Sequence, residues 1–262
     1  GGEIYKELCF GCHGFDGKGM PMQGAPEGTT MAPSLSGSET LNSHRDAVVY
    51  VLLHGLSGPT QGKTYDAQMV AMNTNNDEWI AAAGSYVRNS FGNRGQLVKP
   101  GDVKRIRNAF KERKDPWTVE TLLKRLPGPL SNRGEWKLSA SHNPKTVANA
   151  VDGKIDSRFD TAGFQVPGMW FQIELPRVEQ VCGVRLNAAR SRNDFPRGYK
   201  LQISSDGREW GAPLAEGKGA GPLTEIDFAT VGAKFIRITQ TGSAAGSFWS
   251  IHEMQILTPP AK

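Results

Sequence analysis

Two cysteines separated by two residues and followed at once by a histidine constrain this chain most: Cys9, Cys12 and His13. This spacing is typical of covalent haem attachment, which needs two thiols to add to the haem vinyl groups and an imidazole to reach the iron. A structural zinc site or an unrelated cysteine pair produces the same pattern in other proteins. The neighbouring residues decide between these interpretations.

The sequence around the motif resembles class I cytochromes c over nearly all of residues 1–98. The resemblance rests on four segments: Cys9–Gly19, with the pattern Cys-x-x-Cys-His-Gly-x-Asp-Gly-x-Gly, Ala32–Leu35, Gly62–Tyr65 and Tyr86–Asn93. It implies an all-α domain that carries one covalent haem c and passes single electrons. It also implies that Pro33 lies against the proximal ligand His13 and that Tyr65 belongs to the haem-binding residues.

The sixth iron ligand is expected to be a methionine, because a soft thioether favours ferrous iron and raises the reduction potential. Met69 follows Tyr65 by four residues, close to the placement in the family, whereas Met72 lies nearer the start of the next helix. Relatives usually have proline after the ligand, and here Val70 follows Met69. We predict Met69 as the axial ligand, with Met72 as the alternative.

The next segment, residues 99–131, is basic and is predicted to be a helical connector. Residues 99–134 carry 10 Lys and Arg against 4 Asp and Glu, whereas residues 1–98 carry 6 against 9. Apolar Val103 and Ile106 recur among these charges at helical spacing, which indicates a solvated helix face and not a nucleic-acid surface. No apolar run approaches the roughly 20 residues that a membrane-spanning helix needs. Neither nucleic acid nor a membrane span is therefore expected.

Short apolar runs separated by turn signals characterise residues 132–262. They are Trp170–Leu175, Val181–Leu186, Tyr199–Ile203, Ile226–Phe228, Phe235–Ile238 and Ile251–Leu257. Alternating polarity over such short segments favours strands, and several strands in close succession favour an all-β sandwich. A chain of 262 residues is long enough for two cores. The predicted fold class is therefore multidomain, α plus β.

The motifs of residues 132–262 resemble the coagulation-factor type C domain, a discoidin-like, galactose-binding-like β-sandwich of jelly-roll type. The resemblance rests on the order of Ser139–Ser141, Asn149–Gly153, Ser157–Thr161, Gly168–Leu175, Tyr199–Trp210, Phe235–Ile238 and Phe248–Glu253. Such domains usually bind glycans through loops at one end, and some bind lipid headgroups or proteins. The resemblance implies a carbohydrate-binding module, with partner docking as the alternative.

The loop Asn187–Arg197 is the candidate glycan site. Aromatic rings stack on the apolar faces of sugars, while charged and amide groups bind their hydroxyls. The loop offers both kinds of side chain: Arg190, Arg192, Asn193, Asp194 and Phe195. A solvated loop is the alternative. Trp170, Trp210 and Trp249 lie in strand-like segments and are expected in the core.

Many relatives hold a structural calcium near an Asp-Gly turn, and this chain departs from their pattern. The resemblance implies ligands at Asp152, Ser157 and Glu253, yet Lys154 stands where relatives supply another ligand. An ammonium cannot ligate calcium and can itself take the cation's place beside Asp152 or Glu253. We therefore expect the domain to work without calcium.

These features predict an electron carrier that is not an enzyme by itself. Haem is joined to thiols outside the cytoplasm, so a periplasmic or extracellular location is expected. The chain is expected to be the tail of, or a partner to, an extracytoplasmic sugar dehydrogenase. Two alternatives remain open: a haem enzyme of peroxidase type, which needs an open sixth position and acid–base residues, and an adhesion module with a haem redox sensor.

Overall fold

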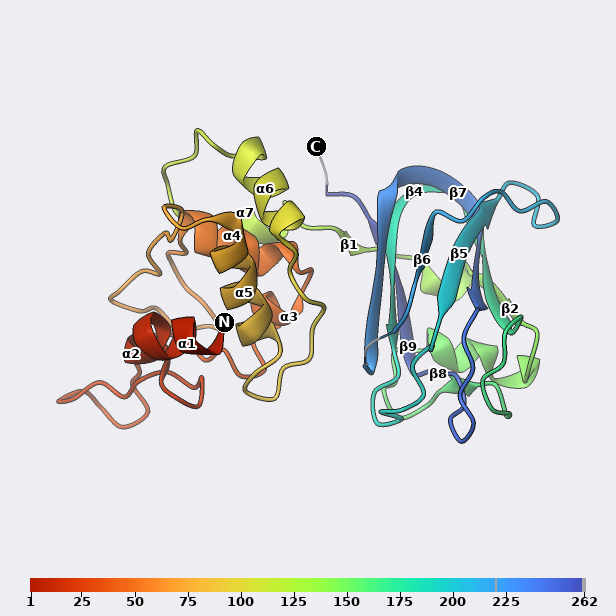
Figure 1. The fold of residues 1–262 in the computed structure, drawn as a ribbon, viewed down its shortest axis with the longest axis horizontal. Coiled ribbons are helices and arrows are strands. Elements are labelled where there is room, and N and C mark those ends of the chain that lie inside the picture. The colour runs from red at the N-terminus through yellow and green to blue at the C-terminus, as the bar shows by residue number, and fades with distance from the viewer. Residues whose placement is uncertain (220, 261–262) are drawn as a thin grey trace. The chain divides into compact units, whose positions relative to one another are not determined.

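A computed structural model describes residues 1–219 and 221–260, which form two compact units. The first, residues 1–126, is helical, and the second, residues 127–260, is built from β-strands (Figure 1). The residues predicted as a connector, 99–131, divide between the two units instead of standing apart. No helix of the described residues is long and apolar enough to cross a membrane.

The first unit contains short helices joined by long loops. They are α1 (Gly2–Ile4), the π-helical turn η1 (Tyr5–Cys9), α2 (Phe10–His13), α3 (Glu39–Asn42), α4 (Asp46–His54), α5 (Asp77–Arg88), α6 (Pro100–Ala109) and α7 (Val119–Leu123). The Asn76 side chain accepts a hydrogen bond from the Trp79 amide and so caps α5, as the preference for asparagine at this position predicts. Pro100 opens α6, where its missing amide hydrogen has no cost.

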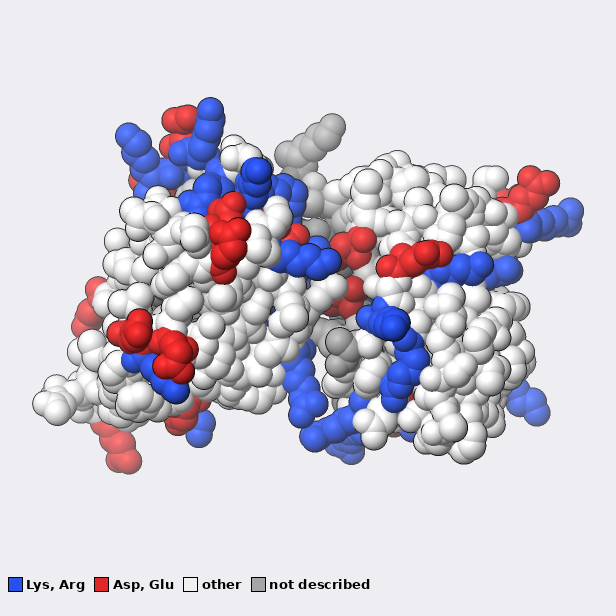
Figure 2. Space-filling view, viewed as in Figure 1, with Lys and Arg blue, Asp and Glu red and all other residues white. Residues whose placement is uncertain are grey.

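Helices α4, α5 and α6 enclose the core of this unit. Val103 and Ile106 of α6 are fully buried in the same cluster as the apolar face of α4. Their helical spacing therefore reflects packing against a core, and the basic residues between them face outward over α6 (Figure 2). Arg105 also donates two hydrogen bonds of 2.8 Å to the buried carboxylate of Asp46 on α4.

The second unit contains antiparallel strands and two 3₁₀ turns. They are β1 (Gly128–Pro129), η2 (Arg133–Glu135), β2 (Lys137–Ala140), η3 (Pro144–Ala150), β3 (Phe159–Asp160), β4 (Trp170–Asn187), β5 (Tyr199–Ser204), β6 (Ala215–Gly217), β7 (Leu223–Gln240), β8 (Ser250–Ile251) and β9 (Glu253–Thr258). The order of the main sheet is β1-β9-β4-β7-β5-β6, with β2 beside β4, and β3 pairs with β8.

The long strands β4 and β7 pair along almost their whole length, and the two halves of β4 have different second neighbours. The first half of β4 pairs with β2 and the second half of β7, while its second half pairs with β9 and the first half of β7. A register shift between Glu174 and Glu179 marks the change between the two halves. Two strands that were predicted separately therefore form the single strand β4, and two others form the single strand β7.

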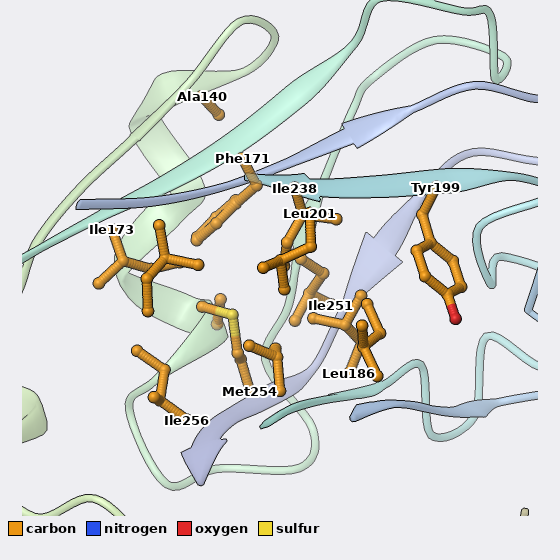
Figure 3. Packing of buried hydrophobic residues seen from close by; sticks show 14 of the residues in the cluster. Ala140, Phe171, Ile173, Leu186, Tyr199, Leu201, Ile238, Ile251, Met254 and Ile256 are labelled. Atoms are coloured by element: carbon orange, nitrogen blue, oxygen red, sulfur yellow. The ribbon is translucent and has the colours of Figure 1, made fainter. Parts of the chain in front are cut away.

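The interior of this unit is apolar, as alternation along the strands predicts. Figure 3 shows residues of this core: Ala140, Phe171, Ile173, Leu186, Tyr199, Leu201, Ile238, Ile251, Met254 and Ile256. The predicted fold class, a helical domain followed by an all-β sandwich, is confirmed.

Candidate functional sites

Cys9, Cys12 and His13 lie on the helical segment that opens the chain, and neither thiol is in a disulfide. The π-helical turn η1 ends at Cys9, and such turns are frequent at functional sites. The segment ends at Gly14, whose φ of +71° favours glycine. Cys9 is half-buried and Cys12 is exposed. Burial, and secondly Cys12, raises the pKa of the Cys9 thiol. Residues three apart share a helix face, so both thiols are available to one group.

The ring of His13 is oriented by the segment that was predicted to touch it. Its Nδ1 lies 3.3 Å from the Pro33 carbonyl oxygen. When the proton is on Nδ1, this contact is a hydrogen bond and Nε2 keeps its lone pair for a metal. Burial lowers the pKa of His13, which favours the neutral, ligating form.

Both candidate thioethers lie against the helical core. Met69 and Met72 are half-buried. The Met69 amide donates to the Leu56 carbonyl at 2.9 Å, and the Leu56 amide donates back at 3.0 Å. The Met72 amide donates to the Leu52 carbonyl at 2.7 Å. The assignment of Met69, with Met72 as the alternative, and the role of the half-buried Tyr65 stay predictions.

In the second unit, three loops meet at Gln165, a residue that sequence reasoning missed. Gln165 is 1% exposed. Its Nε2 donates to the carbonyl oxygens of Phe195 at 3.0 Å and Phe248 at 2.8 Å, and its Oε1 accepts from the Arg197 amide at 3.1 Å. One buried amide therefore joins the loops before β4, after β4 and before β8. A lone glutamine in a loop gives no sequence signal for such a role.

The predicted glycan residues separate into internal and exposed groups. Asp194 accepts a 2.7 Å hydrogen bond from the Ser250 hydroxyl, and the Phe195 ring is covered by the Arg197 guanidinium at 3.9 Å. These side chains support the loop. Arg190, Arg192 and Asn193 are exposed, and Arg190 lies 3.2 Å from the Asp156 carboxylate.

A different aromatic ring in these loops is open to solvent, beside a half-buried one. Phe164 is 55% exposed, and its ring centroid lies 5.9 Å from that of Phe248. Gln165 follows Phe164 directly and holds the Phe248 backbone, so the two rings are fixed near each other. Phe164 stands in the turn-rich segment 161–168, and an aromatic residue there is the signal that could have found it.

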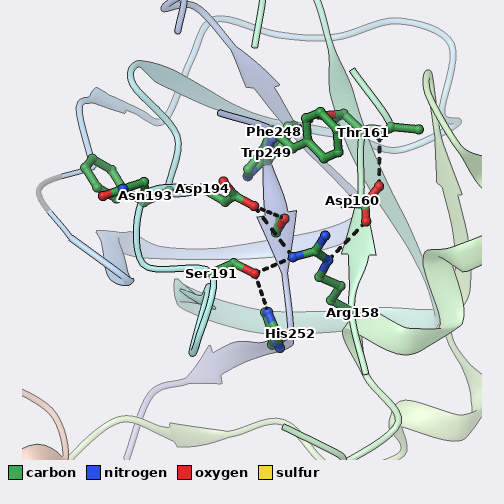
Figure 4. A network of polar contacts seen from close by, with 12 residues as sticks. Arg158, Asp160, Thr161, Ser191, Asn193, Asp194, Phe248, Trp249 and His252 are labelled. Atoms are coloured by element: carbon green, nitrogen blue, oxygen red, sulfur yellow. Dashed lines mark hydrogen bonds and ion pairs between the residues drawn. The ribbon is translucent and has the colours of Figure 1, made fainter. Parts of the chain in front are cut away.

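A polar network joins loops of this unit around Arg158 (Figure 4). Arg158 donates to the Asp160 carboxylate at 3.1 Å and to the Ser191 hydroxyl at 2.5 Å, and lies 3.8 Å from Asp194. The Ser191 hydroxyl and His252 Nε2 lie 2.9 Å apart, and the other ring nitrogen of His252 lies 2.7 Å from a backbone carbonyl oxygen. The loops are therefore held in one arrangement before a ligand arrives.

Comparison with family models assigns both units. Residues 1–90 match the model of cytochrome c, and residues 134–254 match the model of the F5/8 type C domain. The chain carries a cytochrome c domain followed by an F5/8 type C domain.

The chain is also similar to curated proteins and solved structures. Two galactose oxidase sequences of Gibberella zeae are 24% identical over 140 residues, which is 49% of this chain and 21% of the relative. The chain therefore spans about a fifth of their length. The fifth family 32 module of CpGH89 from Clostridium perfringens, in complex with GalNAc-β-1,3-galactose, is 19% identical with a TM-score of 0.42, over 50% of this chain and 99% of that one. The family 32 module of C. perfringens NanJ, in complex with galactose, is 22% identical with a TM-score of 0.42, over 48% and 95%.

The side chains of the cytochrome c domain fit the haem c that such a domain implies. Two reduced thiols, an imidazole whose Nδ1 faces a carbonyl, and half-buried thioethers are the donor types that attach and ligate haem iron. The expected roles of Cys9, Cys12 and His13 are compatible with these surroundings.

The place where the resemblance implies calcium ligands contains an arginine. Arg133 Nη1 lies 2.5 Å from the Glu253 carboxylate, and the Gly153 amide donates to the other carboxylate oxygen. The Ser157 hydroxyl donates to Asp152 at 2.7 Å, and the pKa of Asp152 is lowered by this bond first and by the Lys154 amide second. The positive charge beside Glu253 therefore comes from Arg133, not from the Lys154 side chain. These side chains do not fit a calcium site.

Two of the three tryptophans expected in the core lie on the outer face of the sheet. Trp249 is fully buried. Trp170 and Trp210 are half-buried, and the Arg237 guanidinium lies between them, 4.7 Å and 4.0 Å from the ring centroids. Phe171 takes the inward position next to Trp170, so the alternation of the strand places the tryptophan outside. The expectation was wrong for these two residues.

Proposed function

We propose that the protein carries single electrons on one covalent haem c and binds a carbohydrate through the loops joined by Gln165. Cys9 and Cys12 would attach the haem, His13 and Met69 would ligate its iron, and Met72 is the alternative sixth ligand. Haem supplies one-electron redox chemistry. The chain's own residues would attach it and would orient the imidazole through Pro33. The observation that carries this half is the contact of 3.3 Å between His13 and Pro33.

Covalent attachment is tested on the denatured protein. Acid-acetone extraction should leave the haem on the chain, because thioether bonds survive denaturation. A second measurement asks whether the ferric protein has the weak far-red charge-transfer band of a thioether ligand. Release of free haem would refute the attachment. Rapid binding of peroxide or cyanide to the resting protein would favour the peroxidase-type enzyme instead.

The carbohydrate half rests on the exposed ring of Phe164 next to the half-buried ring of Phe248, and on the exposed polar groups of Arg192 and Asn193 in the neighbouring loop. An aromatic face binds the C–H surface of a sugar, and fixed polar groups bind its hydroxyls. The loops are pre-organised by Gln165, which reduces the ordering cost of binding. A shallow site of this kind favours weak binding to a repeating polysaccharide.

Affinity electrophoresis of the full-length protein against a panel of plant and algal polysaccharides tests this half. Phe164→Ala should weaken retardation about five- to tenfold, as expected for one aromatic contact. Phe15→Ala is the matched control, because Phe15 is 70% exposed and lies in the cytochrome c domain. If no glycan retards the wild type, the alternative of docking a protein partner is favoured.

The electron donor is proposed to be an extracytoplasmic sugar dehydrogenase, either fused to this chain or separate. A glycan-binding domain would keep the haem near the site where such an enzyme oxidises sugars. Haem reduction measured in host extracytoplasmic extract, with and without added sugars, tests this step. Sugar-independent reduction would exclude the sugar dehydrogenase and leave only the role of electron carrier.

A further inference from the structure

We propose that residues 100–117, beyond the part matched to the cytochrome c model, brace the segment that carries the axial methionine. This inference rests on the proposed thioether ligand. The segment in question is Met69–Asn75, named here the methionine segment. Two residues of the extension hold its two ends, Trp117 near Met69 and Arg107 near Asn75.

Trp117 reaches Met69 through one intervening strand-like stretch. Leu56 exchanges two backbone hydrogen bonds with Met69, at 2.9 Å and 3.0 Å. On the other side of Leu56, the Ser57 amide donates to the Trp117 carbonyl at 2.8 Å, and the Trp117 amide donates to the Gly55 carbonyl at 3.1 Å. Trp117, Leu56 and Met69 therefore lie side by side, with Leu56 in the middle.

The indole of Trp117 anchors this arrangement in the core. It is 2% exposed, and its ring packs edge-on against Tyr50 at 5.2 Å and Phe110 at 5.4 Å. The Arg113 guanidinium covers the ring at 3.6 Å. Moving the backbone of residue 117 would require the indole to leave this packing, which couples the position of Leu56 to the helical core.

A glycine allows the methionine segment and the extension to approach each other closely. Gly55 has a φ of +81°, and a Cβ there would lie 2.4 Å from the Met69 carbonyl oxygen and 3.5 Å from Pro116. Side chains larger than hydrogen are therefore excluded where the methionine segment and the extension meet.

Arg107 on α6 holds the other end of the methionine segment. Its Nη1 donates to the Asn73 carbonyl at 2.5 Å, its Nη2 to the Asn75 carbonyl at 2.7 Å, and its Nε to the Asp77 carboxylate at 2.8 Å. A planar guanidinium carries its donors on three separate nitrogen atoms and so reaches three separate acceptors, whereas all donors of an ammonium share one nitrogen. All nitrogen atoms of the Arg107 head group therefore fasten the chain that follows Met72.

An axial methionine is displaced more readily when its segment can move away from the iron. The extension raises the cost of that movement at both ends, because the backbone contacts of Trp117 and the charged donors of Arg107 must break. Loss of hydrogen bonds from a charged donor is expected to raise the open population about tenfold. The extension thus protects the sixth coordination position from foreign ligands.

The test uses the full-length, haem-loaded ferric protein and imidazole as the competing ligand. Arg107→Ala should tighten the apparent binding of imidazole about tenfold. Binding is measured from the Soret shift and from the loss of the far-red band. Trp117→Phe should act in the same direction. Lys104→Ala is the control, because Lys104 is exposed on the same helix, and it should match the wild type.

The outcomes separate this inference from the proposed ligation. If the wild type lacks the far-red band, the thioether ligand itself is wrong and the brace has nothing to hold. If the band is present and both variants bind imidazole like Lys104→Ala, the ligation stands and the brace is refuted. Should Arg107→Ala yield no holo-protein, Arg107→Lys keeps the charge without the planar fork and provides the same comparison.

Discussion

Replacement of Arg133 by glutamine should destabilise the F5/8 type C domain, because this side chain takes the place of a cation. The Arg133 guanidinium contacts Glu253 at 2.5 Å, and it also contributes to the lowered pKa of Asp152. Glutamine keeps much of the length and removes the charge. Without the arginine, the Glu253 carboxylate loses its ion pair and keeps the hydrogen bond that it accepts from the Gly153 amide.

The magnitude follows from how far the pair is shielded from water. The Arg133 side chain is 34% exposed and that of Glu253 is 16% exposed, so the pair lies between a surface ion pair and a buried one. Surface pairs contribute up to about 1 kcal/mol, and breaking a buried pair costs about 3–5 kcal/mol. We expect a loss of about 1.5–2 kcal/mol, which lowers the melting temperature of a domain of this size by about 5–8 °C.

Scanning calorimetry of the full-length protein measures this, with millimolar calcium and with a chelator. Arg177→Gln is the matched control, because Arg177 pairs with Glu179 at 2.7 Å on the surface, and it should change stability by less than about 0.5 kcal/mol. The melting temperature of the wild type should be the same in calcium and in chelator. Stabilisation of the wild type by calcium, or an unchanged melting temperature for Arg133→Gln, would refute the reasoning.

Three further predictions concern single side chains. Met69→Ala should abolish the far-red band of the ferric protein and lower its reduction potential, while Met72→Ala should leave both nearly intact; the reverse result assigns the ligand to Met72. Two backbone amides of its own turn lower the pKa of Asp206 to about 2, so its contribution to stability is present above about pH 3.9 and is lost as the pH falls through 2. The urea midpoints of Asp206→Asn and wild type should therefore differ at pH 7 and converge toward pH 2, and a constant difference would exclude the charge as the cause. Burial raises the pKa of the Cys182 thiol to about 11, so alkylation at pH 8 should be about a hundredfold slower in the folded protein than in urea.

Local patterns predicted the features that depend on neighbours in the sequence. The alternation from Trp170 to Leu175, for example, places every second residue from Phe171 onward in the core. The order of the motifs along the chain was enough to predict both domains, because each motif depends only on residues close to it in the sequence.

Features that depend on distant partners could not be read from the same patterns. The apolar runs on either side of residues 176–180 predicted two strands, yet pairing with β7 continues past the register shift and joins them in β4. The role of the loop Asn187–Arg197 in glycan binding stays a prediction. Its ring Phe195 is covered by Arg197, whereas the ring of Phe164, about thirty residues earlier, is exposed. Which aromatic side chain stays exposed is decided by packing between loops.

The extension, residues 100–117, also has a feature that its local sequence pattern could not predict, and this feature bears on function. Its helical spacing correctly predicted a helix with one apolar face, and its charges were interpreted as a solvated surface. Arg107 is one of those charges, yet its donors are directed at backbone carbonyls more than thirty residues earlier. Nothing local to α6 distinguishes Arg107 from Lys104, because the difference is made by the loop that each residue faces. If the brace acts as we propose, the ligand exchange of the haem is set partly by residues outside the matched cytochrome c sequence, so relatives that share the haem motif but lack this extension should bind imidazole more tightly.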